Sequence, residues 1–402
     1  AQASAAPQPE PPPPAASAQP SAPTRPGQPE PLAQNIPANL ALFHPIGLAP
    51  QPERRRFVFD LGILYSRSGA VSGLALSGGL SQLDRGLRGL QVAAVGAYSA
   101  GDTRGLVVGG MGGITQGRLL GTNAGGLFAL QLGEDTESHR ASFARGASVI
   151  GGSFAGLWSH TAGGMQGLQV SGLAASTTGD FTGLQLAPVG WLGGTARGLQ
   201  LGVVNLSTER LVGSQISVVN VAAQLDGAAL GVVNVGEQAS GVQLGVVNVY
   251  ERNSGVPIGL FNAGHDTTQQ LRVAWSNLYP VNLALHQRTG HTFVELGVAA
   301  KRDALHQDEQ RPELLPSASF GGSWTLAQRF FVEPSLGYGF HVPTRSSSAT
   351  ERHHVSLARL TVGAQLQPWL ALFATGGWQE SVATEGAKTQ GKAEFMAGAQ
   401  IF

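Results

Sequence analysis

The sequence predicts an all-β protein that forms a large antiparallel, up-and-down transmembrane β-barrel. Three observations support this fold class. Only 12% of the 402 residues are charged, and 57 are glycine. No run of 18 or more apolar residues could cross a bilayer as a helix. In the last third of the chain, apolar residues alternate with small or polar ones, the pattern typical of a barrel wall.

The composition also excludes several classes of protein. Basic and acidic residues number 25 each, so the chain lacks the basic excess typical of nucleic-acid-binding proteins. Cysteine is absent, which excludes a disulfide framework, a thiolate metal site and a cysteine nucleophile.

Residues 1–52 are expected to form a disordered tether rich in Pro, Ala and Gln. Eleven of the 23 prolines lie between Pro7 and Pro31, and proline lacks a backbone donor and fixes φ, so helix and sheet are disfavoured there. The chain begins Ala1-Gln2-Ala3-Ser4. From this start we expect a mature form from which a secretion signal has been removed.

Residues 53–266 form a repeat region with a period of 14–16 residues. The clearest copy reads Gly-Val-Gln-Leu-Gly-Val-Val-Asn-Val over 241–249. Each copy predicts one strand of about eight or nine residues and a turn, because Val and Leu favour strands whereas Gly and Asn favour turns. Between Gly167 and Gly264 every charged residue falls in a predicted turn. The clear copies start at Gly167, Gly183, Gly198, Gly213, Gly227, Gly241 and Gly255.

Residues 267–402 lose the repeat but keep the strands. From 330 to 342, large apolar side chains such as Phe330 and Leu336 share one face, and Glu333 and Ser335 lie on the other. Tight links at 327–329 and 367–368 predict antiparallel hairpins. These hairpins are expected to complete the barrel.

Two architectures remain open for the repeats. In the first, repeats and C-terminal strands close one barrel of roughly 20 strands at about 15 residues each. In the second, each repeat is one coil of a β-solenoid, which a small β-barrel follows. The identical repeats favour the solenoid, since barrel strands alternate in direction. The C-terminal strands favour the barrel, because a barrel must close, and we prefer that interpretation.

The repeat motif resembles an uncharacterised family of Gram-negative outer-membrane and surface-repeat proteins. The likeness rests on Gly-Val-Gln-Leu-Gly-Val-Val-Asn and on the exit motif over 255–262, Gly-Val-Pro-Ile-Gly-Leu-Phe-Asn. It covers about residues 57–300. The resemblance implies an outer-membrane or surface location and supplies no catalytic residue.

The most regular polar feature is a set of amide side chains at fixed repeat positions. They could line a polar lumen and bind solutes, or they could stack as hydrogen-bonded ladders between copies. We favour the ladders, because repetition suits stacking. The residues are Gln169, Gln185, Gln200, Gln215, Gln243, Asn205, Asn220, Asn234 and Asn248.

Candidate chemical sites are sparse. His286 and His291 flank a predicted turn and are expected to be exposed loop residues, and the adjacent His353 and His354 would point to opposite faces of a strand, a poor metal chelate. We therefore predict no metal site and no cofactor.

A hydrolase embedded in the barrel is a minor alternative. Its candidates are Ser317, Ser335 and Ser356, with His341 and Glu333 on neighbouring strands. Because small polar residues are also ordinary in a barrel lumen, we expect no enzymatic activity.

We therefore expect a non-enzymatic outer-membrane protein of a Gram-negative bacterium, with a structural or pore-forming role. The alternative is a surface-exposed β-solenoid adhesin or interaction protein at the cell surface or in the periplasm. Expected partners are outer-membrane lipid and the barrel-insertion machinery, with small solutes possible and no nucleic acid.

Overall fold

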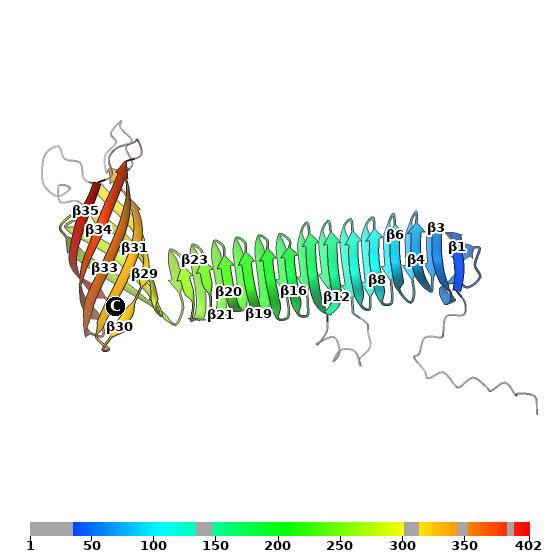
Figure 1. The fold of residues 1–402 in the computed structure, drawn as a ribbon, viewed down its shortest axis with the longest axis horizontal. Coiled ribbons are helices and arrows are strands. Elements are labelled where there is room, and N and C mark those ends of the chain that lie inside the picture. Colours follow the sequence, from blue (N-terminus) through cyan, green and yellow to red (C-terminus); the bar gives the residue numbers. More distant parts are fainter. Residues whose placement is uncertain (1–34, 134–146, 301–312, 344–352, 384–389) are drawn as a thin grey trace, which may run out of the picture.

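The computed structural model describes residues 35–133, 147–300, 313–343, 353–383 and 390–402. It is built from two sheets, an elongated parallel one and a closed antiparallel one (Figure 1). The all-β prediction is thereby confirmed. Among these residues, no helix is long and apolar enough to cross a membrane.

The first sheet is a β-solenoid over residues 35–263. A short 3-10 helix, η1 (Pro52–Arg54), interrupts its first turns. Its first strands are β1 (Asn35–Phe43), β2 (Ile46–Gly47), β3 (Arg56–Ser68), β4 (Ala70–Ser77), β5 (Leu80–Leu83), β6 (Leu87–Ala93), β7 (Gly96–Ser99), β8 (Thr103–Gly109), β9 (Gly112–Gln116), β10 (Leu119–Gly125), β11 (Phe128–Leu132) and β12 (Ala147–Ala155). The remainder are β13 (Trp158–Thr161), β14 (Gly164–Ser171), β15 (Ala174–Thr177), β16 (Phe181–Leu186), β17 (Val189–Leu192), β18 (Ala196–Leu201), β19 (Val204–Ile216), β20 (Val219–Leu230), β21 (Val233–Ala239), β22 (Val242–Leu244), β23 (Val247–Asn253), β24 (Val256–Ile258) and β25 (Phe261–Ala263).

Successive repeats pair in parallel and in register. Gly183 of β16 lies beside Gly167 of β14 and Gly198 of β18, and the residues that follow pair likewise. The glycine is required, because Gly198 has φ +137° and a β-carbon there would lie 1.9 Å from the carbonyl oxygen of Gly183. The repeat glycine therefore allows one coil to stack directly on the next.

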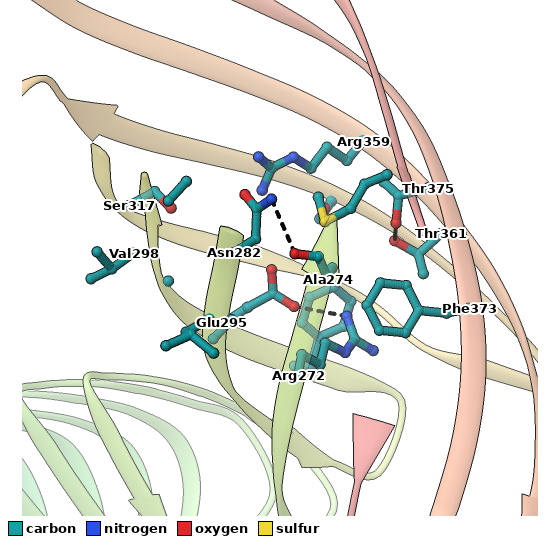
Figure 2. Close-up of a pocket in the computed structure, with 17 residues that line it drawn as sticks. Arg272, Ala274, Asn282, Glu295, Val298, Ser317, Arg359, Thr361, Phe373 and Thr375 are labelled. Atoms are coloured by element: carbon teal, nitrogen blue, oxygen red, sulfur yellow. Dashed lines mark hydrogen bonds and ion pairs between the residues drawn. The ribbon is translucent and has the colours of Figure 1, made fainter. Parts of the chain in front are cut away.

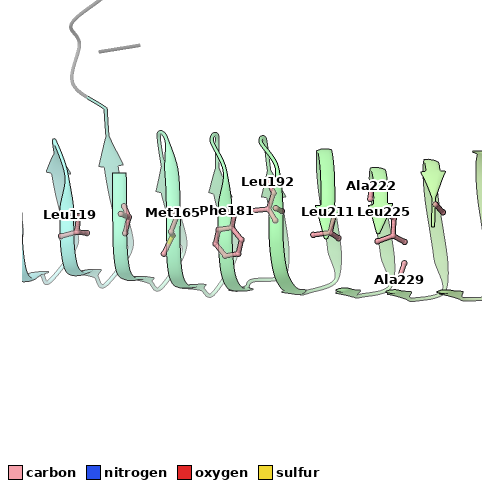
Figure 3. Close-up of a cluster of buried hydrophobic side chains, with 11 residues drawn as sticks. Leu119, Met165, Phe181, Leu192, Leu211, Ala222, Leu225 and Ala229 are labelled. Carbon is pink, nitrogen blue, oxygen red and sulfur yellow. The ribbon is translucent and has the colours of Figure 1, made fainter. Parts of the chain in front are cut away.

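An apolar column runs through the interior of the solenoid over residues 119–239 (Figure 3). Met165, Phe181 and Leu211 occupy equivalent positions of different coils and are at most 1% exposed. Inward-pointing residues thus contact their counterparts in the next coil, which explains why one short repeat can build the whole region.

The second sheet is a small barrel over residues 267–402. β26 pairs with both β27 and β35, so the sheet closes without an edge. β29 continues into β30 and β31 into β32, which gives eight wall strands. The strands are β26 (Thr267–Ser276), β27 (Val281–Thr289), β28 (Thr292–Ala300), β29 (Glu313–Gly322), β30 (Trp324–Leu326), β31 (Phe330–Phe340), β32 (Val342–Pro343), β33 (His353–Gln367), β34 (Leu370–Ala383) and β35 (Gln390–Ile401).

These findings correct the preferred architecture. The repeats do not join an antiparallel barrel of roughly 20 strands; they form a parallel solenoid, which a small barrel follows, as the alternative had it. The physical reason is the short repeat: each copy holds two short strands separated by a turn at its second glycine, so equivalent strands of successive copies run in the same direction.

The predicted tether also needs correction. Residues 1–34 lie outside the described part of the chain, but residues 35–52 are not a disordered segment. β1 pairs in parallel with β3, and Asn39 and Ala41 of β1 are buried. This segment therefore covers the first edge of the solenoid, which would otherwise present unpaired backbone groups.

Candidate functional site

The outer wall of the barrel is apolar, and its interior holds buried charged and polar side chains together with two apolar clusters, around Leu315 and Phe373. Leu336 and Phe395 point outward and are 73% and 64% exposed, whereas Arg272 and Glu394 point inward and are at most 5% exposed. Exposed apolar residues on the wall around enclosed charges are the reverse of the distribution in a water-soluble barrel. Further exposed apolar residues of the wall include Trp275, Leu283, Leu360, Leu372 and Trp378.

A charged network fills one half of the lumen. Arg272 of β26 donates from Nη1 to Glu295 Oε2 at 2.7 Å, from Nε to Gln400 Oε1 at 2.7 Å, and from Nη2 to Glu333. Its guanidinium lies 5.1 Å from the ring centroid of Phe373. One cation from β26 therefore ties together acceptors on β28, β31 and β35 across the barrel.

His286 completes this network. Its Nδ1 lies 3.4 Å from Glu295 Oε2, and its Nε2 lies 3.5 Å from Glu333 Oε1. Ser323 donates to the same Glu333 oxygen at 2.8 Å. His286 is fully buried, so the expectation of an exposed loop histidine was wrong for this residue: the strand continues to Thr289 and turns its side chain into the lumen.

The other half of the lumen holds a second polar group (Figure 2). Arg359 donates to Glu394 at 2.8 Å, and the hydroxyls of Thr361 and Thr375 lie 2.8 Å apart. The cavity between the two groups measures about 30 Å³, room for one or two water molecules. Side chains therefore fill the lumen, as expected for eight strands.

The structure also places the residues of the hydrolase alternative. Ser317 and Ser335 line the lumen cavity, but Glu333 is bound by Arg272 and Ser323. The ring of His341 lies 6.4 Å from that of Tyr279. Ser356 pairs with Tyr338 and Glu380 on neighbouring strands, and it is exposed. Ser323 and His286 do meet, but both contact Oε1 of Glu333, at 2.8 Å and 3.5 Å, whereas a catalytic chain has the histidine between the serine and the carboxylate.

The amide side chains of the repeats all point into the solenoid, where they are at most 2% exposed. Gln185, Gln200 and Gln215 each donate to the glutamine of the preceding coil at 2.8–2.9 Å. Ala229 follows Gln215 in this column, so the glutamine ladder stops there. Gln243 instead accepts a hydrogen bond from Asn253 at 3.2 Å.

The asparagines form a second ladder. Asn220 donates to Asn234 at 2.9 Å, and the series continues through Asn248 to Asn262 at 2.8 Å; Asn205 begins it at 3.4 Å. Asn234 also donates to the carbonyl of Leu244 at 3.1 Å. Both ladders are enclosed in the solenoid and are inaccessible to a solute.

The barrel caps the last coil of the solenoid. Gln287 on the outer face of β27 accepts from the backbone N–H of Asn262 and donates to the carbonyl of Leu260, both at 2.7 Å. The hydroxyl of Tyr250 lies 2.7 Å and 2.8 Å from those of Thr267 and Thr289. Hydrogen bonds therefore join the barrel to the solenoid. Two of them, from the Gln287 side chain, satisfy backbone groups at the open edge of the last coil.

Sequence reasoning missed most of the lumen network. Arg272, Glu295, Arg359 and Glu394 carried no motif, although each is a charged residue on the small or polar face of an otherwise apolar strand. That signal could have identified them. No cluster of three or more metal-ligating side chains occurs within the described ranges.

Comparisons with known proteins add no family. No family model matches the sequence, and no match was found among curated proteins or solved structures.

Proposed function

We propose that this chain is a structural, non-enzymatic protein of the Gram-negative outer membrane, in which the barrel anchors the solenoid. The reversed polarity of the barrel carries the proposal: Leu336 and Phe395 face outward, and Arg272 and Glu394 are enclosed. A closed barrel satisfies its backbone internally, as a bilayer demands. The resemblance of the repeats to surface-repeat proteins supports the same location.

The filled lumen favours an anchor over a pore. A channel needs a continuous polar path, whereas the space left between Arg272 and Thr375 has room for only one or two water molecules. Lipid and the barrel-insertion machinery are then the expected partners.

The connections between strands favour a periplasmic solenoid. At one end of the barrel, β27–β28 and β33–β34 are joined by two residues each, and the solenoid enters at Thr267 of the same end. At the other end the connections include 301–312, 344–352 and 384–389. Outer-membrane barrels place short turns in the periplasm and longer loops outside. We therefore place the solenoid in the periplasm rather than at the cell surface.

The anchor is tested by electrophoresis of the full chain. Membranes are washed with carbonate and extracted with detergent, and the protein is run in SDS with and without heating. We expect retention after the wash and a faster unheated band, as a folded barrel gives. Equal mobility together with release by carbonate would refute the anchor.

The side of the membrane is tested in intact cells. The chain has no cysteine, so Glu237→Cys on the solenoid gives a single label site. A membrane-impermeant maleimide should label it only after the outer membrane is permeabilised. Labelling of intact cells would instead support the adhesin alternative.

A further inference from the structure

We propose that the solenoid lies along the membrane, with one apolar edge buried in the acyl chains of the leaflet at the short-turn end of the barrel. This inference rests on the proposed membrane anchor. The apolar edge is the column of turn residues Val95, Met111, Leu127, Leu157, Leu173, Pro188, Val203, Val218, Val232, Val246 and Leu260.

The apolar edge is continuous and exposed. Its members stack through backbone hydrogen bonds, such as Val232 to Val218 and Val246 to Val232, both 2.9 Å. Apart from Pro188, which is half-buried, they are 39–55% exposed. Ten steps of about 4.8 Å give a stripe roughly 48 Å long. Water-exposed apolar stripes of this extent mark an interface.

The opposite edge of the solenoid carries the charges. Arg210 and Asp226 form an ion pair there, and Ser240 donates to Asp226. The solenoid is therefore amphipathic across its width, with an apolar edge and a charged edge separated by the length of one strand. The charged residues from Gly167 to Gly264 are Asp180, Arg197, Glu209, Arg210, Asp226, Glu237, Glu251 and Arg252.

The junction with the barrel fixes which edge faces the membrane. Tyr250, next to charged Glu251, bonds to Thr289 at the short-turn end of β27. The carbonyl of Leu260, in the apolar edge, accepts a hydrogen bond from Gln287. Gln287 lies on the same strand but two residues farther from the short turn, toward the apolar middle of the barrel wall. The apolar edge therefore lies on the side of the junction nearer the apolar middle of the barrel wall, and the charged edge lies on the short-turn side.

Continuity with the barrel wall identifies lipid as the occupant. From Gln287 toward the middle of β27, the next outward residues are Leu285 and the exposed Leu283. The apolar edge of the solenoid therefore meets the barrel at the point where the outward residues of the wall become apolar. Apolar faces of interfacial elements bury about 5–10 Å into the head-group and acyl boundary. A second copy of the chain would also cover the apolar edge, but it would not account for the continuity between this edge and the apolar wall of the barrel.

The test uses the full chain reconstituted in phospholipid vesicles. Single variants Val218→Cys (apolar edge), Glu209→Cys (charged edge) and Leu360→Cys (barrel wall) carry an environment-sensitive fluorophore. The vesicles contain lipids with a quencher in the acyl chain. We expect strong quenching at positions 218 and 360 and at least fivefold weaker quenching at 209.

Each outcome decides between the two proposals. Quenching at 360 but equal, weak quenching at 218 and 209 would overturn the lipid-bound edge and leave the anchor intact. Weak quenching at all three would overturn both. Cross-linking between copies through Val218→Cys, without quenching there, would assign the edge to a second copy and also overturn the inference.

Discussion

Solenoid and barrel both enclose polar side chains and expose apolar ones, but they satisfy the enclosed groups differently. In the solenoid, neutral amides such as Asn220 and Asn234 bond to the same residue type 14 positions away. In the barrel, Arg272 bonds to Gln400, which is 128 positions away. In a repeat, an identical residue lies at the equivalent position of the next coil. Amide side chains both donate and accept hydrogen bonds, so they can form ladders between coils. The barrel has no such repeat, and its Arg272 guanidinium is satisfied by the carboxylates of Glu295 and Glu333 as well as by Gln400.

The largest effect should come from the glycine column, which exists only in the solenoid. Gly198→Ala would place a β-carbon 1.9 Å from the oxygen of Gly183 at φ +137°. We expect a loss of more than about 3 kcal/mol. Hydrogen exchange of the full chain in mild detergent should show lost protection in β16–β19, with the barrel unchanged.

The matched control is a barrel glycine. A β-carbon at Gly376 would have no heavy atom within 4 Å, so Gly376→Ala should change protection little. Equal losses for the two variants would show that the stacked glycines do not set the solenoid apart.

The second effect concerns the charged lumen. Arg272→Met removes the cation between Glu295 and Glu333 and leaves buried carboxylates uncompensated, at a cost of about 3–5 kcal/mol. The temperature at which the folded band converts in SDS should fall markedly. Arg288→Met, a half-buried arginine at the rim of the same barrel, is the control, and an equal fall there would contradict the network's role.

How far the sequence predicts each region follows the same contrast. The ladders were predictable, because Gln185 and Gln200 recur at the spacing of the repeat and bond at that spacing. The direction of the strands was not, since the motif alone leaves open whether successive copies run parallel. The lumen network was predictable only as polar faces. Which of Glu295, Glu333 and Glu394 binds which arginine depends on strand stagger that no local pattern encodes.

A smaller effect should follow from breaking a single ladder rung. Asn234→Ala removes the donor to Asn248 and to the carbonyl of Leu244, and leaves the donor of Asn220 without its acceptor. We expect a loss of about 1–3 kcal/mol. Denaturant unfolding of the full chain measures it. Val235→Ala, at an exposed neighbouring position, should have a much smaller effect, and comparable losses would refute the ladder's contribution.

The smallest expected effect on stability concerns Asp60, an ionisable side chain enclosed in the solenoid, where most enclosed polar groups are neutral. Asp60 is a fully buried carboxyl in the first coils of the solenoid, and Asn39 donates to it at 2.8 Å. Burial raises the pKa of Asp60 above its ordinary value of 3.8, and the hydrogen bond from Asn39 offsets this only in part. Ionised Asp60 thus costs stability in the fold.

The sign of the pH dependence follows from this raised pKa. The stabilising effect of the protonated form is complete below about pH 3.8 and is lost as the pH rises through the folded-state pKa. Asp60→Asn keeps an acceptor for Asn39 without the charge. We therefore expect the variant to match the parent in acid and to exceed it in stability at pH 7, seen as slower hydrogen exchange in β1 and β3. Faster exchange at pH 7 would show that the first coils need the charge, as the barrel does.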